Sequence, residues 1–85
     1  MFAVRYSKRA LKALRKAEAG IAAGIMAKID QLAADPFAKG LDTKRLQGRD
    51  GYRLRVGEWR VLHDLDTKAK SISIEDIADR KDAYK

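Results

Sequence analysis

The sequence predicts an α+β domain in which a two-helix hairpin packs on one face of a mostly antiparallel sheet. Three observations lead to this prediction. Apolar residues recur at helical spacing up to Ala34, apolar and polar residues alternate in the second half, and a glycine-containing pair separates the two clearest strands. A chain of 85 residues can form one core, so we expect a single domain over residues 1–85 with the order β-α-α-β-β-β-β and a short C-terminal tail or helix.

The first part of the chain predicts one strand and two helices. Phe2–Tyr6 reads as a short opening strand, and Ser7 is a suitable N-cap for a helix over Lys8–Lys16. A second helix is expected from Glu18 to Ala34, and Pro36 limits it because the residue before a proline avoids the helical conformation. The apolar residues expected to face the sheet from these helices are Leu11, Leu14, Ile21, Ile25, Ile29 and Leu32.

The second part predicts four strands, of which the middle two form a tight hairpin. The pair Gly57-Glu58 suits a two-residue type II′ turn, because glycine accepts the positive φ of the first turn position. This turn joins Tyr52–Val56 to Trp59–His63, with a strand over Lys44–Gln47 before the hairpin and one over Ser71–Ile77 after it. The expected cross-strand pairs are Val56 with Trp59, Arg55 with Arg60, Leu54 with Val61, Arg53 with Leu62 and Tyr52 with His63.

Alternation along these strands gathers three arginines on one face of the sheet. Arg53, Arg55 and Arg60 share this face, although like charges opposite one another destabilise a sheet. Guanidinium groups fork onto phosphate oxygens and stack on bases, so we expect the cluster to bind single-stranded nucleic acid. The other face is expected to join the core through Tyr52, Leu54, Val56, Trp59, Val61, His63 and Leu65. The alternative reading of the cluster is that each arginine pairs with a local acid, the candidates being Glu58, Asp64 and Glu75.

Composition narrows the class of function. Nineteen Lys and Arg against twelve Asp and Glu give a net charge of +7, which favours a polyanion or an acidic protein as partner, or serves solubility alone. Without cysteine and with a single histidine the chain offers no disulfide or thiolate site, so we expect no metal and no cofactor. That histidine, His63, is expected to be structural. No signal peptide or membrane span is visible, so we expect a cytoplasmic protein without membrane contact.

The C-terminal tail adds a cation and an aromatic residue. If the last strand lies beside the strand that begins at Trp59, Arg80 reaches the rim of the arginine face. Tyr84 is then able to stack on a base or to hydrogen-bond a ribose hydroxyl. The alternative is a frayed terminus with an incidental tyrosine.

Several of these segments together resemble the RelE family of the RelE/ParE toxins from toxin–antitoxin pairs. The strongest similarity lies in the hairpin segment YRLRVGEWRVL over Tyr52–Leu62 and in the tail from Ile77 to Tyr84. Further matching segments are Tyr6-Ser7, Ala10–Leu14, Ile29–Pro36 and Leu46-Gln47-Gly48, so the resemblance covers nearly the whole chain.

The resemblance implies a small ribonuclease that enters the ribosomal A site and cuts mRNA there, through attack of a ribose 2′-hydroxyl on the adjacent phosphate. By position, Arg53 and Arg55 match the basic pair of the first hairpin strand and Arg60 matches the phosphate-stabilising arginine. Arg80 matches the cation near the leaving group, and Tyr84 matches the tyrosine that orients the substrate. The further cations expected to contact nucleic acid are Lys44, Arg45, Arg49 and Lys81.

This resemblance does not identify the group that moves the proton, for which Asp79 and Tyr84 are the two candidates. Relatives often carry lysine at one or both first-strand positions, whereas arginine stays protonated and is a poor general base. Many relatives also carry a histidine or a cation where this chain has Asp79, and often a basic residue at the position of Gln47.

The resemblance also implies partners. We expect a cognate acidic antitoxin, the ribosome with its mRNA, and operator DNA only through the antitoxin complex. Two other functions remain open: a ParE-like inhibitor of DNA gyrase, which shares the fold, and a non-enzymatic nucleic-acid-binding domain, for which the arginine face suffices.

Overall fold

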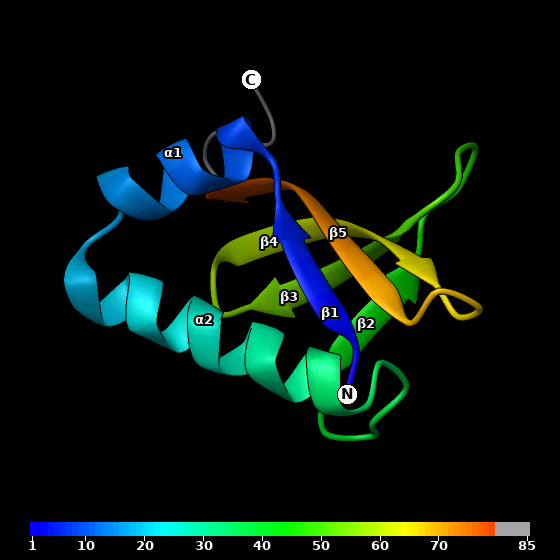
Figure 1. Ribbon diagram of the computed structural model, residues 1–85. Helices are drawn as coiled ribbons and strands as arrows, with labels where there is room; N and C mark the ends of the chain where they lie inside the picture. Colours follow the sequence, from blue (N-terminus) through cyan, green and yellow to red (C-terminus); the bar gives the residue numbers. More distant parts are fainter. Residues whose placement is uncertain (80–85) are drawn as a thin grey trace.

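The computed structural model describes residues 1–79, and it confirms the predicted α+β order (Figure 1). Two helices follow the first strand, and four strands follow the helices. The elements are β1 (Ala3–Tyr6), α1 (Lys8–Lys16), α2 (Ala19–Ala34), β2 (Asp42–Arg45), β3 (Tyr52–Val56), β4 (Trp59–Asp66) and β5 (Ser71–Asp79). Neither helix is long and apolar enough to cross a membrane within these residues.

The strands form one mixed sheet in the order β1-β5-β4-β3-β2. The strands from β2 to β5 are antiparallel to their neighbours, whereas β1 runs parallel to β5, beside which it lies in Figure 1. The pairing of β4 with β5 shifts at one point, because Leu62 pairs with Asp76 while His63 pairs with Ile74. Glu75 is therefore the extra residue of a β-bulge. Residues three apart in a regular strand lie on opposite faces, but the bulge lets Ile74 and Ile77 both reach the core.

The start of α1 is tied to this bulge. The Ser7 side chain caps the helix by accepting a hydrogen bond from the backbone N–H of Ala10, at 3.0 Å. Its hydroxyl also donates to the backbone carbonyl of Glu75, at 2.6 Å. The predicted N-cap is thus confirmed, and it fixes α1 against β5.

The core lies between the two helices and one face of the sheet. Its buried members on these helices and strands come from α1, α2, β3, β4 and β5: Ala10, Ile25, Ile29, Leu32, Leu54, Val61, Ile72, Ile74 and Ile77. Two predicted core positions are wrong, since Leu11 and Ile21 are each 38% exposed. On α1 the buried side instead runs through Ala10, which turns Leu11 outward. Ile21 lies in the first turns of α2, where a hollow separates the helix from the hairpin turn.

Two glycines weaken the same end of α2. Gly20 lies in the first turn, and Gly24, in the helix interior, costs up to about 1 kcal/mol relative to alanine. Tertiary packing of Ile25, Ile29 and Leu32 therefore holds this helix on the sheet.

The edge strand β2 lies two residues earlier than predicted. It spans Asp42–Arg45 rather than Lys44–Gln47. The backbone N–H of Leu46 bonds to the carbonyl of Gly51, at 3.0 Å, so the chain closes a loop at this point instead of continuing along β3. Gly51, with a φ of 116°, lets that loop close.

Candidate functional site

The hairpin of β3 and β4 has the predicted turn and register. Gly57 has a φ of 59°, while Glu58 does not have a positive φ, as a type II′ turn requires. Each expected pair is present, from Val56 opposite Trp59 to Tyr52 opposite His63. The local sequence alone therefore determines which residues share a face.

The two faces of the hairpin differ as the alternation predicts. Leu54 and Val61 are fully buried under the helices. On the other face Arg55 is exposed, and Arg53 and Arg60 are half-buried. The three arginines thus lie on the side of the sheet that the helices leave open.

The neighbouring edge strand adds cations to this face. Lys44 lies directly opposite Arg53 across β2 and β3, and Asp42 lies opposite Arg55. Together these strands line a hollow of about 290 Å³, which we call the basic groove: Lys44, Arg45, Leu46, Gln47, Arg53 and Arg60. Arg60 also lines an adjoining hollow of about 270 Å³ beside Arg55 and the hairpin turn. Arg60 is therefore at the junction of two open hollows, which suits a residue that contacts a nucleic-acid backbone.

Arg53 is the most constrained cation of the groove. Its Nε atom is buried and has no hydrogen-bond partner within residues 1–79. A buried donor without a partner costs about 1–3 kcal/mol. Arg53 is therefore held in the wall of the basic groove at a cost to folding.

The alternative that nearby acids neutralise the arginines does not hold for Arg53 and Arg55. In the described part of the chain, neither of them forms an ion pair. Glu75, one of the predicted acids, instead bonds to Arg49, with 3.1 Å between Nη2 and Oε2. Arg49, expected to contact nucleic acid, is thus engaged outside the basic groove.

A pair of carboxylates lies farther along the open face. A hydrogen bond with Asp64 raises the pKa of Glu75, and burial and the charge of Asp64 act in the same direction against the opposing charge of Arg49. Asp64 also approaches Gly51, where a Cβ would lie 3.0 Å from its carboxylate oxygen. This cluster was not predicted, because the bulge that places Glu75 beside Asp64 leaves no signal in the sequence.

His63 is a structural histidine, as predicted. It is 3% exposed and stacks on Tyr52, with ring centroids 5.7 Å apart and an interplanar angle of 20°. Burial lowers the pKa of His63, against weaker effects from the Val61 backbone and the Asp64 charge that raise it. The imidazole lies on the core face, away from the arginines.

The stability of the fold is expected to decrease in mildly acidic solution because of His63. Since its pKa is lowered by folding, the unfolded chain takes up a proton first as the pH falls below the ordinary value of 6.5. The stabilisation is therefore complete above that value and is lost as the pH falls through the folded pKa. The measurement is the free energy of unfolding in urea at about pH 7.5 and about pH 5.5. The difference between the two values should be smaller for His63→Phe than for the wild type. An equal difference in both proteins would contradict the assignment.

Of the predicted site residues, the structure brings Lys44, Arg45, Arg53 and Arg60 together in the basic groove and places Arg55 beside it. Three more, Arg80, Lys81 and Tyr84, lie outside the described residues. Residues 1–79 contain no group of three or more His, Asp or Glu side chains placed to bind a metal ion. The chemistry that the described groove supports is the binding and charge stabilisation of a phosphate.

Comparison with known proteins gives full-length matches. No protein-family model matches the chain. RelE1 of Methanocaldococcus jannaschii is 35% identical over 86 residues, which cover 99% of this chain and 96% of RelE1.

Solved structures show the same fold. A chain of the archaeal RelE–RelB complex from Pyrococcus horikoshii superposes with a TM-score of 0.81 at 28% identity, covering 93% of this chain and 94% of that one. A chain of the RelB–RelE antitoxin–toxin complex from Methanococcus jannaschii gives 0.78 at 23% identity, covering 94% of each. A chain of the RelBE complex of E. coli gives 0.76 at 18% identity, covering 93% of this chain and 96% of that one.

Proposed function

Since this chain belongs to the RelE family, we propose that it is the toxin of a type II toxin–antitoxin pair and that it cleaves mRNA on the ribosome. The observation that supports this proposal best is the basic groove, which gathers Lys44, Arg45, Arg53 and Arg60 on the open face of the sheet. Phosphate is the ligand that such a groove prefers, because forked guanidinium groups match its oxygens.

In the proposed reaction the 2′-oxygen of a ribose attacks the adjacent phosphorus. The 2′-hydroxyl loses its proton as the bond between O2′ and phosphorus forms. The bond from phosphorus to O5′ breaks and O5′ takes up a proton, so the products are a cyclic phosphate and a free 5′-hydroxyl. Arg53 and Arg60 bind the phosphate oxygens and stabilise the negative charge that grows on them in the transition state. Both guanidinium groups stay protonated, so neither accepts the 2′ proton.

The remaining roles fall partly on the tail. We assign Arg80 to the departing O5′ and Tyr84 to orientation of the substrate. Lys44 and Arg45 extend the groove along the nucleic-acid strand, and Arg55 supplies a further phosphate contact beside the turn.

The proposed partners are an acidic antitoxin and, for substrate, the ribosome with its mRNA. The relative from Pyrococcus horikoshii was crystallised as a complex with RelB. With a net charge of +7, this chain attracts an acidic partner over a long range. Operator DNA is expected to be contacted through the antitoxin complex.

Mapping of mRNA 5′ ends after induced expression of the chain tests the proposal. The expected result is a set of new 5′-hydroxyl ends inside translated codons, which disappear when translation is blocked before induction. Double-strand DNA breaks without mRNA cuts would instead identify a gyrase inhibitor. Nucleic-acid binding with neither type of cut would identify a plain binding domain.

A further inference from the structure

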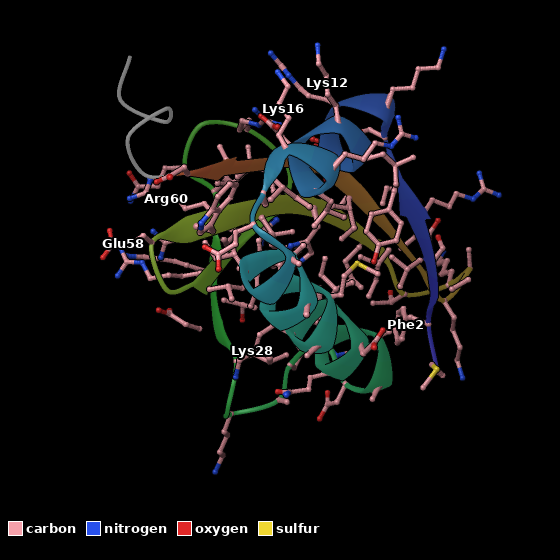
Figure 2. All side chains as sticks on the ribbon, turned by 90° about the vertical axis from the view of Figure 1, so that its left-hand side faces the viewer. Phe2, Lys12, Lys16, Lys28, Glu58 and Arg60 are labelled. Atoms are coloured by element: carbon pink, nitrogen blue, oxygen red, sulfur yellow. The ribbon has the colours of Figure 1, made fainter. Side chains whose placement is uncertain are left out.

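The basic groove has two lining residues that carry no charge. These are Leu46, which is half-buried, and Gln47, which is exposed, and the other lining residues within 1–79 are cations. Figure 2 shows Arg60 apart from Lys12 and Lys16, which project from α1, so the groove is a basic surface of its own. Because an uncharged pair adds nothing to the attraction of phosphate, Leu46 and Gln47 have a different role in the groove.

Leu46 and Gln47 begin the loop between β2 and β3, and this loop is closed at its base. The backbone N–H of Leu46 bonds to the carbonyl of Gly51, at 3.0 Å. A Cβ at Gly51 would lie 3.0 Å from the Asp64 carboxylate and 3.3 Å from the backbone oxygen of His63. The end of the loop therefore packs directly on β4, where glycine is required by these contacts and by the φ of 116°.

The outer part of the loop is held against β5 by Arg49, whose Nη2 lies 3.1 Å from Oε2 of Glu75. The backbone carbonyl of Glu75 accepts a hydrogen bond from the Ser7 hydroxyl, at 2.6 Å, so the bulge that carries this carboxylate is itself fixed. Both side chains of the ion pair are partly exposed, so the pair adds little to the free energy of unfolding but restricts where the loop lies. Leu46 and Gln47 therefore line the groove from a supported loop, as a specific binding site requires.

The side chains of Leu46 and Gln47 have the chemistry of a contact to a base. Phosphate contacts position a nucleic acid, whereas contacts to the bases distinguish one sequence from another. In single-stranded RNA, side chains pack on the face of a base and hydrogen-bond its edge. The Gln47 carboxamide offers donors and an acceptor side by side, and Leu46 beside it in the groove offers an aliphatic surface.

We propose that Leu46 and Gln47 form a base-recognition site in the wall of the basic groove, and that the preferred base is adenine. Adenine carries its N6 donor beside its N7 acceptor, so a carboxamide bonds to both at once, whereas guanine has two acceptors on the same edge. Arg49 and Glu75 are positioning residues, because they hold the loop that carries the site. This inference rests on the proposed function for its RNA substrate, and it adds which base lies in the groove.

Binding of short RNAs by the purified chain tests the site without any cleavage. The probes are hexanucleotides with 2′-O-methyl riboses, which lack the attacking hydroxyl, and each carries A, C, G or U at one position among uridines. We expect the wild type to bind the adenine probe about tenfold more tightly than the other three. Gln47→Ala should reduce this difference to within about twofold, because the carboxamide is lost. Fluorescence anisotropy measures the dissociation constants.

Two control variants separate base recognition from general effects. Gln31→Ala removes the same side chain from an exposed position on α2 and should retain the adenine preference. Lys44→Ala removes a phosphate contact, so it should weaken the binding of all four probes by the same factor and leave their ratio unchanged.

The positioning role of Arg49 is tested with the same probes. Arg49→Ala should reduce the adenine preference by about threefold, since the ion pair that holds the loop is lost. Arg49→Lys keeps a cation opposite Glu75 and should recover part of the preference. The temperature of unfolding of both variants should stay near that of the wild type. If Arg49→Ala instead weakens the binding of all four probes equally, Arg49 contacts phosphate and its positioning role is wrong.

The bases that flank the cuts in cellular mRNA provide a second measurement, with adenine enriched for the wild type and less enriched for Gln47→Ala. Equal affinities for the four probes, or a preference that Gln47→Ala retains, would overturn the base-recognition site. A preference for another base would overturn the choice of adenine. An adenine preference in a chain that cuts no mRNA would contradict the proposed nuclease alone. Cleavage of mRNA by a chain that shows no base preference would contradict this inference alone.

Discussion

Replacing Arg60 with alanine is expected to reduce mRNA cleavage by about 100- to 1,000-fold, because one preorganised donor to the transition state is lost. Arg60 lines both open hollows and lies on the face away from the core, so the fold should remain. The measurement is the rate of cleavage of a ribosome-bound mRNA, with circular dichroism of the same preparation as the check on folding.

Two matched variants refine this test. Arg5→Ala removes an exposed arginine from β1, at the far edge of the sheet, and should cleave like the wild type. Arg60→Lys retains the charge but loses the forked donor geometry, so an intermediate rate is expected. A folded Arg60→Ala protein with normal cleavage would show that the basic groove is not the phosphate site.

Replacing Leu54 with aspartate is expected to prevent folding. Leu54 is fully buried in the core, and the change removes its packing and places an unpaired carboxylate among aliphatic side chains. Loss of a buried leucine alone costs about 2–5 kcal/mol, and the buried charge adds several more, which approaches the whole stability of a small domain.

The neighbouring residue provides the control. Arg55→Asp introduces the same side chain one position along β3, on the exposed face, and the protein should give a native circular dichroism spectrum and a cooperative thermal transition. A native spectrum for Leu54→Asp would mean that the faces of β3 are reversed. Together the two variants test the alternation on which the whole site depends.

The two faces of the sheet have different roles in this fold. The open face carries the basic groove, and the covered face carries the core. Adjacent residues of β4 alternate between the two faces, so Trp59 packs against the core while Arg60 lines the basic groove.

The sequence by itself determined the hairpin and its chemistry. Gly57 specified the turn through its positive φ, and the period of the strands then placed Arg53, Arg55 and Arg60 together and His63 opposite Tyr52. The two helices and the Ser7 cap were likewise set by neighbouring residues. These features depend on dihedral preferences and on the alternation of side chains over a few residues, so the local sequence is sufficient to predict them.

Only the tertiary structure decided which distant residues meet. The parallel placement of β1 beside β5, the bulge at Glu75 and its pairing with Arg49 all depend on contacts between segments far apart in the chain. The exposure of Ile21 likewise follows from how α2 crosses the hairpin, although its spacing matches that of buried neighbours. Local periodicity predicts which side of a helix or strand is apolar. How much of that side is buried is determined by the packing of the helices and strands against one another.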